Sequence, residues 1–313
     1  MNNLPKIALG AWSWGSGAVG GDEVFGNHLD KVSLKPVFDA AKNNNLKLWD
    51  TAYVYGMGAS ENILGSFIKE ENRKDYIIST KFTPQVEDGT ADAVQNMLNG
   101  SKERLHTDYI DIYWIHNPMD VEKWTPFLIP LAKTGQIKYI GVSNHNLKEI
   151  RRANEILNSA GLKISAIQNH YSLLHTSSED SGILDYCNEN NIVFFSYMIL
   201  EQGALTGKYD TKHPFPKDSD RGNYYNKSLT KLESLIEEMK TIGKKYNASP
   251  AQIAIAWAIC KGTLPIIGVT SAEQVEEAAN ASKIILTKEE INTLQELGKK
   301  SGVSTLRNWE KEM

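Results

Sequence analysis

The chain has 313 residues, enough for one large α/β domain, since α/β barrels commonly run to roughly 250 residues with insertions beyond that. Its 34 Lys and Arg residues against 38 Asp and Glu residues leave a formal net charge of −4, so the composition offers no basis for binding nucleic acid or an anionic membrane. We therefore expect a small molecule as the partner of this protein.

The cysteines Cys187 and Cys260 lie far apart in the sequence, which argues against a disulfide framework and fits a reducing compartment. The most apolar helical stretch, Ile253 to Cys260, falls well short of the ~20 residues that a membrane span needs. The N-terminal residues lack the basic and then apolar order of a secretory signal. We expect a cytoplasmic protein, and the composition indicates no particular oligomeric state.

Short apolar runs rich in Ile, Val, Leu and aromatic residues recur along the chain and predict eight strands. Runs without polar alternation are typical of parallel strands that helices cover on the outside. The predicted strands are Lys6–Leu9, Leu46–Trp49, Tyr76–Ser79, Ile110–Ile115, Ile137–Val142, Ile164–Ile167, Ile192–Ser196 and Leu264–Ile267.

The connections between these runs carry apolar residues at three- and four-residue spacing, which predicts amphipathic helices. One of them opens with Ser249 as N-cap and Pro250 at the first helical position. The predicted helices are Leu34–Lys42, Ser60–Lys69, Ala91–Leu105, Leu147–Asn158, Lys227–Tyr246, Pro250–Cys260 and Ser271–Ala281.

Strand and helix alternate eight times, which favours a closed (β/α)8 TIM barrel of parallel strands with residues 1–313 as one domain. The alternation of strands and helices by itself also fits an open doubly wound sheet. The connection after the seventh strand, Leu200 to Asn226, is rich in Gly, Lys, Pro, Asp and Tyr and is too long for an ordinary loop. We expect it to form a mobile lid or clasp.

Polar residues follow the predicted strands, at the carboxyl ends where barrels of this kind place their chemistry. A free tyrosine titrates near pKa ~10, and a neighbouring ammonium lowers that value. A lysine held by an aspartate would thus tune a tyrosine as proton donor, while a neutral histidine orients a carbonyl. These residues are Asp50, Lys81, His116, Ser143, Asn144, Gln168 and Tyr197, with Tyr55 five positions after Asp50.

Each of these residues taken alone also fits a structural role, such as a helix cap, a solvated rim residue or a satisfied core histidine. Four reactive types at successive strand ends favour a catalytic role for the group.

The same residues lie in a longer pattern. Asp50-Thr51-Ala52-Tyr53-Val54-Tyr55-Gly56, followed by Gly58-Ala59-Ser60-Glu61, resembles the Asp-Thr-Ala-x-x-Tyr-Gly motif of the aldo-keto reductase superfamily in its bacterial-type form. The likeness, which extends to the branch with potassium-channel β-subunit-like reductases, continues in order through Ser79-Thr80-Lys81, Asp111 to His116, Gly141 to Asn144, Gln168 to Ser172 and Gly203 to Tyr209.

This resemblance implies a barrel that binds NADP(H) and passes hydride to an aldehyde or ketone, with Asp50, Tyr55, Lys81 and His116 as the catalytic tetrad. It also implies cofactor contacts. Ser143, Asn144 and Gln168 would hold the nicotinamide carboxamide, Tyr197 would stack beneath the ring, and Trp12 and Asp50 would lie near the cofactor. The pyrophosphate clasp would comprise Leu200, Gly203, Lys208 and Arg221, and the adenosine end Gly268, Thr270, Gln274 and Glu277.

Thr270 stands where many members of the family carry Arg or Lys for the 2'-phosphate of NADP. Some members with a hydroxyl there still take NADPH, so we expect NADP first, with NAD possible. Leu9-Gly10-Ala11-Trp12 resembles the family's Leu-Gly-Thr-Trp, which places Trp12 near the cofactor and Trp14 near the pocket mouth, although ordinary packing is equally expected for Trp14. The pocket would be lined by Trp12, Trp14, Phe82, Asn117 and the lid.

Two alternatives stay open at this point. A metal-dependent barrel hydrolase could use His116, His145 and His170, but the first strand offers no ligand pair and no His-Glu-x-x-His occurs, so we predict no metal. A non-catalytic NADP(H)-binding redox sensor would share the fold. The segment Gly15 to Gly20 spells Gly-x-Gly-x-x-Gly, but a dinucleotide fingerprint must open a helix and more glycine follows at Gly21 and Gly26, so we interpret the segment as a flexible rim loop.

Overall fold

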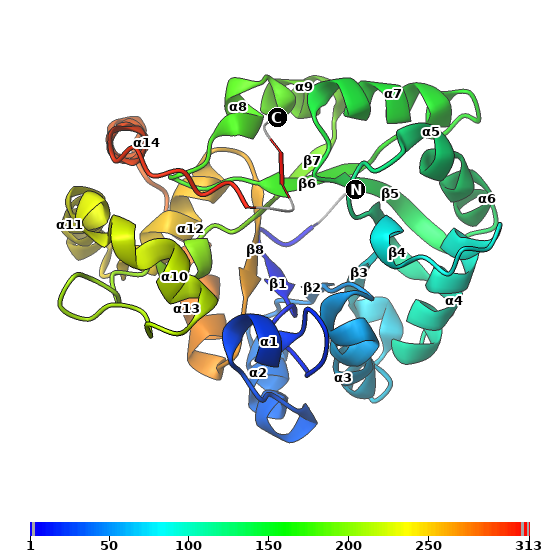
Figure 1. The fold of residues 1–313 in the computed structure, drawn as a ribbon, viewed down its shortest axis with the longest axis horizontal. Coiled ribbons are helices and arrows are strands. Elements are labelled where there is room, and N and C mark those ends of the chain that lie inside the picture. The colour runs from blue at the N-terminus through cyan, green and yellow to red at the C-terminus, as the bar shows by residue number, and fades with distance from the viewer. Residues whose placement is uncertain (2–3, 308–309, 312) are drawn as a thin grey trace.

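The structure is a computed structural model that describes residues 1, 4–307, 310–311 and 313. Eight parallel strands follow one another in sequence order and close into a barrel, with the last strand pairing with the first. Helices form a ring around it (Figure 1). The predicted TIM barrel is confirmed. The strands are β1 Ala8–Gly10, β2 Leu48–Asp50, β3 Ile77–Phe82, β4 Ile110–Ile115, β5 Ile137–Ser143, β6 Ala166–His170, β7 Val193–Tyr197 and β8 Leu264–Gly268.

The predicted helices are all present, with ends shifted by a few residues at most. They are α2 Lys31–Asn43, α3 Ala59–Ile68, α4 Ala93–Arg104, α7 Leu147–Asn158, α11 Leu229–Tyr246, α12 Pro250–Cys260 and α13 Ala272–Ala281. Ser249 is the N-cap of α12, as expected, and it forms a capping box with Gln252. The remaining helices are α1 Gly21–Phe25, α5 Val121–Trp124, α6 Leu128–Lys133, α8 Ser177–Asp180, α9 Ile183–Asn190, α10 Asp220–Tyr225 and α14 Lys288–Lys300.

The glycine-rich segment Gly15 to Gly20 lies in a loop, and the five-residue helix α1 begins directly after it. The predicted loop is therefore present, a short helix follows it, and the flexibility of the loop remains a prediction. The loop lies against Trp12, whose indole Nε1 donates to the Val19 carbonyl at 3.1 Å.

The protein has two apolar layers, one outside the barrel and one inside it. The larger layer lies between the strands and the surrounding helices. The smaller one fills the barrel itself, where the rings of Trp114 and Phe195 meet edge to face with centroids 5.2 Å apart. The buried residues of this inner layer are Ala8, Leu48, Ile112, Trp114, Ala166, Phe195 and Leu264.

Gly141 makes room for the largest side chain of the inner layer. It pairs with Trp114 across β5 and β4. A Cβ atom at this position would lie 2.1 Å from the Trp114 ring, nearer than two carbon atoms approach without a bond. The absence of a side chain at position 141 is therefore a condition for placing Trp114 inside the barrel.

The long connection after β7 is anchored in this structure by buried aromatic side chains. A short 3-10 turn at Glu201–Gly203 starts it, and α10 lies near its end. Phe215 and Tyr225 are buried, and the rings of Tyr209 and Phe215 stack with centroids 3.8 Å apart. That this connection moves as a lid remains a prediction.

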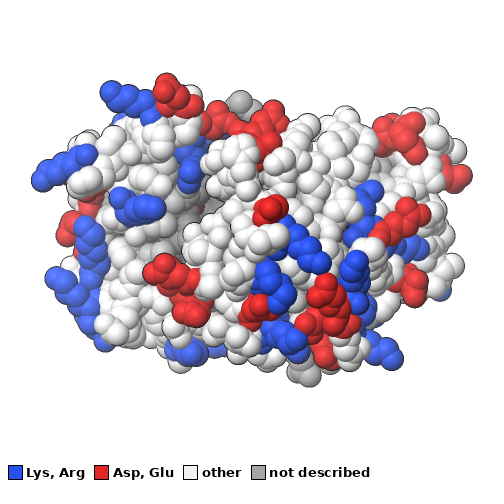
Figure 2. Space-filling view, turned by 90° about the horizontal axis from the view of Figure 1, so that it is seen from below, with Lys and Arg blue, Asp and Glu red and all other residues white. Residues whose placement is uncertain are grey.

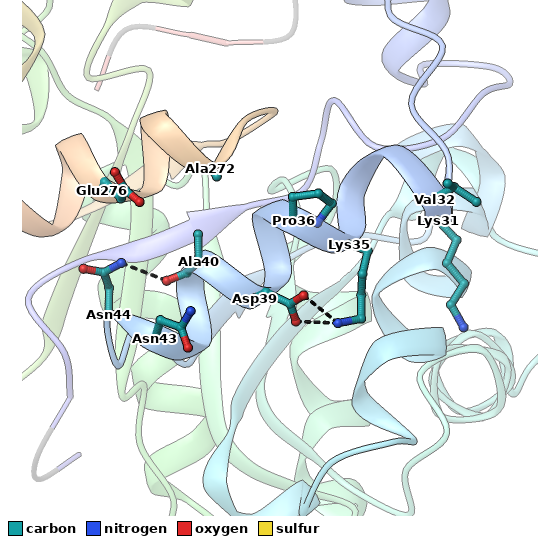
Figure 3. A pocket seen from close by; sticks show the side chains of 10 residues that line it. All are labelled: Lys31, Val32, Lys35, Pro36, Asp39, Ala40, Asn43, Asn44, Ala272 and Glu276. Carbon is teal, nitrogen blue, oxygen red and sulfur yellow. Dashed lines mark hydrogen bonds and ion pairs between the residues drawn. The ribbon is translucent and has the colours of Figure 1, made fainter.

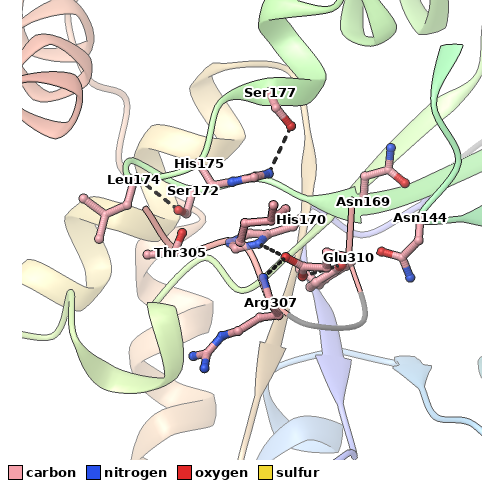
Figure 4. Close-up of polar contacts among 12 residues, drawn as sticks. Asn144, Asn169, His170, Ser172, Leu174, His175, Ser177, Thr305, Arg307 and Glu310 are labelled. Carbon is pink, nitrogen blue, oxygen red and sulfur yellow. Dashed lines mark hydrogen bonds and ion pairs between the residues drawn. The ribbon is translucent and has the colours of Figure 1, made fainter. Parts of the chain in front are cut away.

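The chain after α14 returns across the carboxyl ends of β6 and β7 (Figure 1). There His170 lies between two carboxylates, with Nε2 2.9 Å from Glu201 and Nδ1 2.9 Å from Glu310. Figure 4 shows the contact with Glu310. Burial by itself would lower the pKa of His170, but Glu201 and then Glu310 raise it to about 9. A buried imidazolium thus holds the C-terminal segment to the barrel at neutral pH.

Side chains of both signs share the face of the molecule shown in Figure 2, with uncharged surface between them. Within the part of the chain that the structure describes, no helix is long and apolar enough to cross a membrane.

We predict that Gly141→Ala lowers the free energy of unfolding by about 1 to 3 kcal/mol, because the new methyl group forces Trp114 or its strand to shift. Urea denaturation measures this loss. Gly100→Ala is the matched control: on α4 its added Cβ meets only the flexible guanidinium end of Arg104, so it should be neutral or gain up to ~1 kcal/mol. Equal stability of Gly141→Ala and the unaltered protein would contradict the packing described.

We predict that stability falls as the pH rises from about 6.5 to about 9. Since the pKa of His170 is raised on folding, its contribution is complete below the ordinary value of 6.5 and is lost as the pH passes about 9. At ~1.4 kcal/mol for each tenfold change in proton affinity, the loss is on the order of 3 kcal/mol. Denaturant titrations across this range should show it in the unaltered protein and a flatter dependence in His170→Gln. The exposed His213→Gln is the control and should keep the full slope.

Candidate active site

The strand geometry brings the predicted site residues together at the barrel mouth. Side chains alternate between the two faces of a strand, so a residue two positions beyond an interior one faces the interior again. Leu48 and Trp114 lie inside the barrel. Asp50 stands two residues after Leu48, and His116 stands two residues after Trp114. The other residues that continue interior positions in this way are Lys81, Ser143, Gln168 and Tyr197.

Tyr55 is held on a tight turn directly after β2. The 3-10 turn Tyr55–Gly58 has left-handed backbone at Gly56 (φ 63°) and Gly58 (φ 97°), which glycine adopts without strain. A Cβ at Gly58 would also lie 2.7 Å from Arg104 Cδ. Ser60, at the start of α3, donates to the Ala11 carbonyl at 2.7 Å and so fastens this turn to β1. These contacts explain the small residues of the motif.

Asp50, Lys81 and Tyr55 form one hydrogen-bonded group. The Lys81 ammonium lies 2.6 Å from Asp50 Oδ2 and 3.1 Å from the Tyr55 hydroxyl. It also donates to the Thr51 carbonyl at 2.9 Å. Lys81 is fully buried and Asp50 is 3% exposed, so this is a desolvated ion pair with each of its charged atoms paired. Its ammonium is therefore fixed against the tyrosine oxygen.

The pKa values of this group follow from burial and from the ion pair. Burial alone would lower the pKa of Lys81, but the Asp50 carboxylate and the Tyr55 oxygen together outweigh it and the pKa is raised. Burial raises the pKa of Tyr55, and the nearby ammonium opposes this effect only in part. The expected net lowering of the Tyr55 pKa was thus wrong for this structure. The phenol is protonated at neutral pH, and the Lys81 ammonium beside it would stabilise a phenolate at this position.

His116 completes the group from the side of β4. Its ring meets the Tyr55 ring edge on, with centroids 5.9 Å apart. Burial, with a smaller contribution from the Lys81 charge, holds the pKa of His116 well below its usual range, so the imidazole is neutral at pH 7. Its Nδ1 lies 2.7 Å from the Thr83 hydroxyl, and its carbonyl accepts from Asn144 Nδ2 at 3.0 Å.

The residues predicted to hold the nicotinamide lie beside the tetrad and contact one another. The Tyr197 hydroxyl lies 2.5 Å from Asn144 Oδ1 and 2.8 Å from Glu310. Gln168 Nε2 donates to Asp50 Oδ1 at 3.0 Å, and Asn144 Nδ2 lies 3.4 Å from the Ser143 hydroxyl. The four predicted residues therefore share one small region at the ends of β5, β6 and β7.

The predicted clasp residues gather in the connection after β7. Gly203 has a left-handed backbone (φ 111°) and donates its N–H to the Leu200 carbonyl at 2.9 Å. The charged groups of Lys208 and Arg221 lie 5.7 Å from the rings of Tyr209 and Phe215 respectively, and these two rings stack on each other. Two cations thus flank one aromatic pair.

The predicted adenosine end lies at the start of α13. Gln274 Oε1 accepts from the Thr270 N–H at 2.7 Å and from its hydroxyl at 3.1 Å. Gly268 is exposed at the end of β8 with open space where a Cβ would lie. Glu277 lies one turn further along α13, and burial with repulsion from Glu273 raises its pKa. Thr270 and Gln274 are in contact, and Glu277 shares their helix.

The structure separates the residues predicted to line the pocket. Trp12 lies at the mouth and stacks on Tyr55 with ring centroids 5.7 Å apart. Trp14 is fully buried, donates to the Val269 carbonyl and packs on Trp49, so its placement at the pocket mouth was wrong. Phe82 likewise faces the helix layer, where it packs on Trp124. Both side chains sit on outward-facing positions of their segments, which the sequence comparison could not reveal.

Some contributors to the site were not predicted. Ser79 donates to Asp50 Oδ1 at 2.5 Å, and its place two residues before Lys81 on the same strand could have indicated this. Thr83, two residues after Lys81, could have been found by the same count. Asn117, which was predicted, bonds to Gln85 at the rim. Nothing local to Glu310 indicated that the C-terminal segment returns to Tyr197.

The surface also offers a hollow away from the tetrad. A groove of about 760 Å³ lies between α2 and α13 (Figure 3). The Lys35–Asp39 ion pair spans part of its lining. None of the tetrad lines it. Among the residues described, no group of three or more His, Cys, Asp or Glu side chains is arranged to hold a metal ion.

Comparisons with known proteins agree with this geometry. The sequence matches the Aldo/keto reductase family over residues 6–299. Pyridoxal reductase, chloroplastic, of Arabidopsis thaliana is 30% identical over 324 aligned residues that cover 98% of this chain and 86% of that protein. Aldo-keto reductase yakc (NADP(+)) of Schizosaccharomyces pombe is 29% identical, with 90% of this chain and 87% of that protein covered.

The fold has a close structural counterpart as well. The crystal structure of the thermostable aldo-keto reductase Tm1743 in complex with the inhibitor epalrestat superposes with a TM-score of 0.76 at 25% identity, covering 94% of this chain and 95% of that chain. The family match begins just before β1 and ends within α14, so it contains all the residues predicted for catalysis and for cofactor binding. The chain therefore belongs to the aldo/keto reductase family of oxidoreductases.

Proposed function

We propose that this protein reduces an aldehyde or ketone to an alcohol, with Tyr55 as the general acid and a reduced nicotinamide nucleotide as the hydride source. The observation that carries the proposal is the Tyr55 hydroxyl, 3.1 Å from an ammonium that Asp50 holds in place. A protonated phenol beside a fixed cation suits proton donation to a developing alkoxide, since the cation stabilises the phenolate that results.

The other residues of the tetrad have separate roles in this proposal. Lys81 stabilises the Tyr55 phenolate, and Asp50 keeps Lys81 charged and oriented. His116, neutral at pH 7, donates a hydrogen bond to the substrate oxygen without competing for the transferred proton. Oxidation of an alcohol uses the same groups in reverse, with the phenolate of Tyr55 as the base.

The residues present fit a nicotinamide dinucleotide phosphate. The Nε atom of Arg221 is buried and has no hydrogen-bond partner among the described residues, so the clasp contains an unsatisfied cationic donor. Lys208 is exposed close by. Ser143, Asn144 and Gln168 would hold the carboxamide, Tyr197 the ring, and Thr270, Gln274 and Glu277 the adenosine end. We propose NADP(H) as the first cofactor, in line with the name of the yakc relative, and NAD(H) as the second.

The substrate is proposed to be a small carbonyl compound. Trp12 and Phe25 meet edge to face with ring centroids 5.2 Å apart, and Trp12 stacks on Tyr55, so the approach to the proton donor is aromatic on one side. Flat aromatic aldehydes suit such a surface. Because the Arabidopsis relative is named a pyridoxal reductase, pyridoxal belongs in the first panel of substrates.

The primary test is a titration with NADPH and with NADH followed by the fluorescence of the 7 tryptophans, then turnover of an aldehyde panel with the tighter cofactor. We expect tight binding of NADPH and turnover of at least one aldehyde. Binding without turnover of any carbonyl would favour a redox sensor instead. Binding of neither nucleotide would contradict the proposed function altogether.

We predict that Tyr55→Phe lowers turnover by ~100- to 10,000-fold and leaves the Kd for NADPH nearly unchanged, because only the transferable proton is removed. Steady-state kinetics and fluorescence titration measure the two effects. Tyr53→Phe is the matched control: its ring faces Arg104, 4.7 Å away, and its hydroxyl lies outside the tetrad. Unchanged turnover in Tyr55→Phe would refute the assignment of the acid.

We predict that Arg221→Ala raises the Kd for NADPH by roughly 10- to 100-fold, since one charge-assisted pair of hydrogen bonds to phosphate is lost. The chemical step under saturating cofactor should be little affected. Lys217→Ala removes an exposed cation from the same connection and serves as the control. If both variants bind NADPH as tightly as the unaltered protein, the clasp is not where the pyrophosphate lies.

A further inference from the structure

Thr83 lies at a position from which it can act on the active site through His116. It follows Lys81 by two residues, and its backbone is extended (φ −110°, ψ 104°), so it continues the inward-facing row of β3. The proline at position 84 restricts Thr83 to this extended region. Its side chain is buried, with 5% of the residue exposed. Thr83 is thus a buried polar residue in the layer of the tetrad.

The contact between Thr83 and His116 is set by the backbone. Strands β3 and β4 pair up to Phe82 and Ile115, and the N–H of His116 donates to the Phe82 carbonyl at 2.8 Å. The two residues that follow these partners are therefore held side by side. Their side chains meet with Thr83 Oγ1 2.7 Å from His116 Nδ1, a normal hydrogen-bond length.

The protons of this pair allow two arrangements. A neutral imidazole carries one N–H, on either Nδ1 or Nε2, and the threonine hydroxyl carries one proton. If Nδ1 carried the proton, the hydroxyl would accept, and its own proton would need another acceptor in a buried place. Among the described residues, His116 is the one partner of the Thr83 hydroxyl. An unsatisfied buried donor is costly, so the hydroxyl donates to Nδ1 and the imidazole proton stays on Nε2.

Resting on the reduction proposed above, we propose that Thr83 is a positioning residue that donates its hydroxyl proton to His116 Nδ1 and so keeps the Nε2 proton free for the substrate oxygen. The His116 ring already meets Tyr55 edge on. The carbonyl oxygen would then receive two donors, the Tyr55 hydroxyl and His116 Nε2–H. Without the threonine hydroxyl, the imidazole is free to place its proton on Nδ1, and Nε2 then presents a lone pair that repels the same oxygen.

The test compares Thr83→Val, which keeps the side-chain shape and removes the hydroxyl, with Thr83→Ser, which keeps the hydroxyl and removes a methyl group. For an aldehyde that the unaltered enzyme reduces, we expect a roughly 10- to 100-fold lower kcat in Thr83→Val. In Thr83→Ser we expect a kcat within about threefold of that of the unaltered enzyme. The Kd for NADPH should be unchanged in both variants. In the background of His116→Gln, Thr83→Val should have no further effect, because the residue through which it acts is gone.

A second readout does not depend on turnover. Nitrogen-15 NMR of the His116 imidazole distinguishes the two neutral tautomers, and we expect the Nε2–H form in the unaltered protein and in Thr83→Ser, with the Nδ1–H form appearing in Thr83→Val. An Nδ1–H form in the unaltered protein would overturn the inference. So would equal loss of kcat in Thr83→Val and Thr83→Ser, which would show that volume matters and the hydroxyl does not. If no carbonyl is reduced at all, the proposed function fails, while the NMR result still decides the role of Thr83.

Discussion

The buried ion pair between Asp50 and Lys81 is the interaction on which the site depends. Two charges removed from water are stabilised only when their geometry is good and every remaining polar atom is paired. Ser79 and Gln168 donate to the second oxygen of Asp50, and the Thr51 carbonyl accepts from Lys81. Removing either member would leave the other charge buried without its partner. The pair is therefore both a structural constraint and the source of the cation that faces Tyr55.

The barrel supports this charged layer with an apolar one beneath it. Trp114 and Phe195 fill the interior, and Gly141 leaves the space that Trp114 occupies. Several strands carry an interior apolar residue and, two residues later, a polar residue at the carboxyl end. The register of the sheet therefore decides which polar side chains meet at the barrel mouth. The low local dielectric that results strengthens the contact between Lys81 and Tyr55 and keeps His116 neutral.

A second buried charge ties distant parts of the chain to the mouth of the barrel. Glu310, near the C-terminus, contacts His170 from one side (Figure 4), and Glu201, at the start of the long connection, contacts it through the other ring nitrogen. Glu310 also contacts the hydroxyl of Tyr197, the residue proposed to lie beneath the nicotinamide. The long connection after β7, the C-terminal segment and Tyr197 are thus linked through the His170 imidazolium and its two carboxylates.

The sequence by itself determined the order of strands and helices and singled out the four residues that we propose as the catalytic tetrad. Continuous apolar runs report burial on both faces, and Asp50, Tyr55, Lys81 and His116 stand in a recognisable pattern. The tertiary structure alone decided that the barrel closes, since β1 to β8 pairing joins segments more than 250 residues apart. Only the structure showed that Trp14 and Phe82 lie in the core between strands and helices, and that burial raises the pKa of Tyr55. It also showed that Thr83 and Glu310 contact residues of the site. Local patterns do not encode these features because each depends on which remote side chains surround a residue after folding.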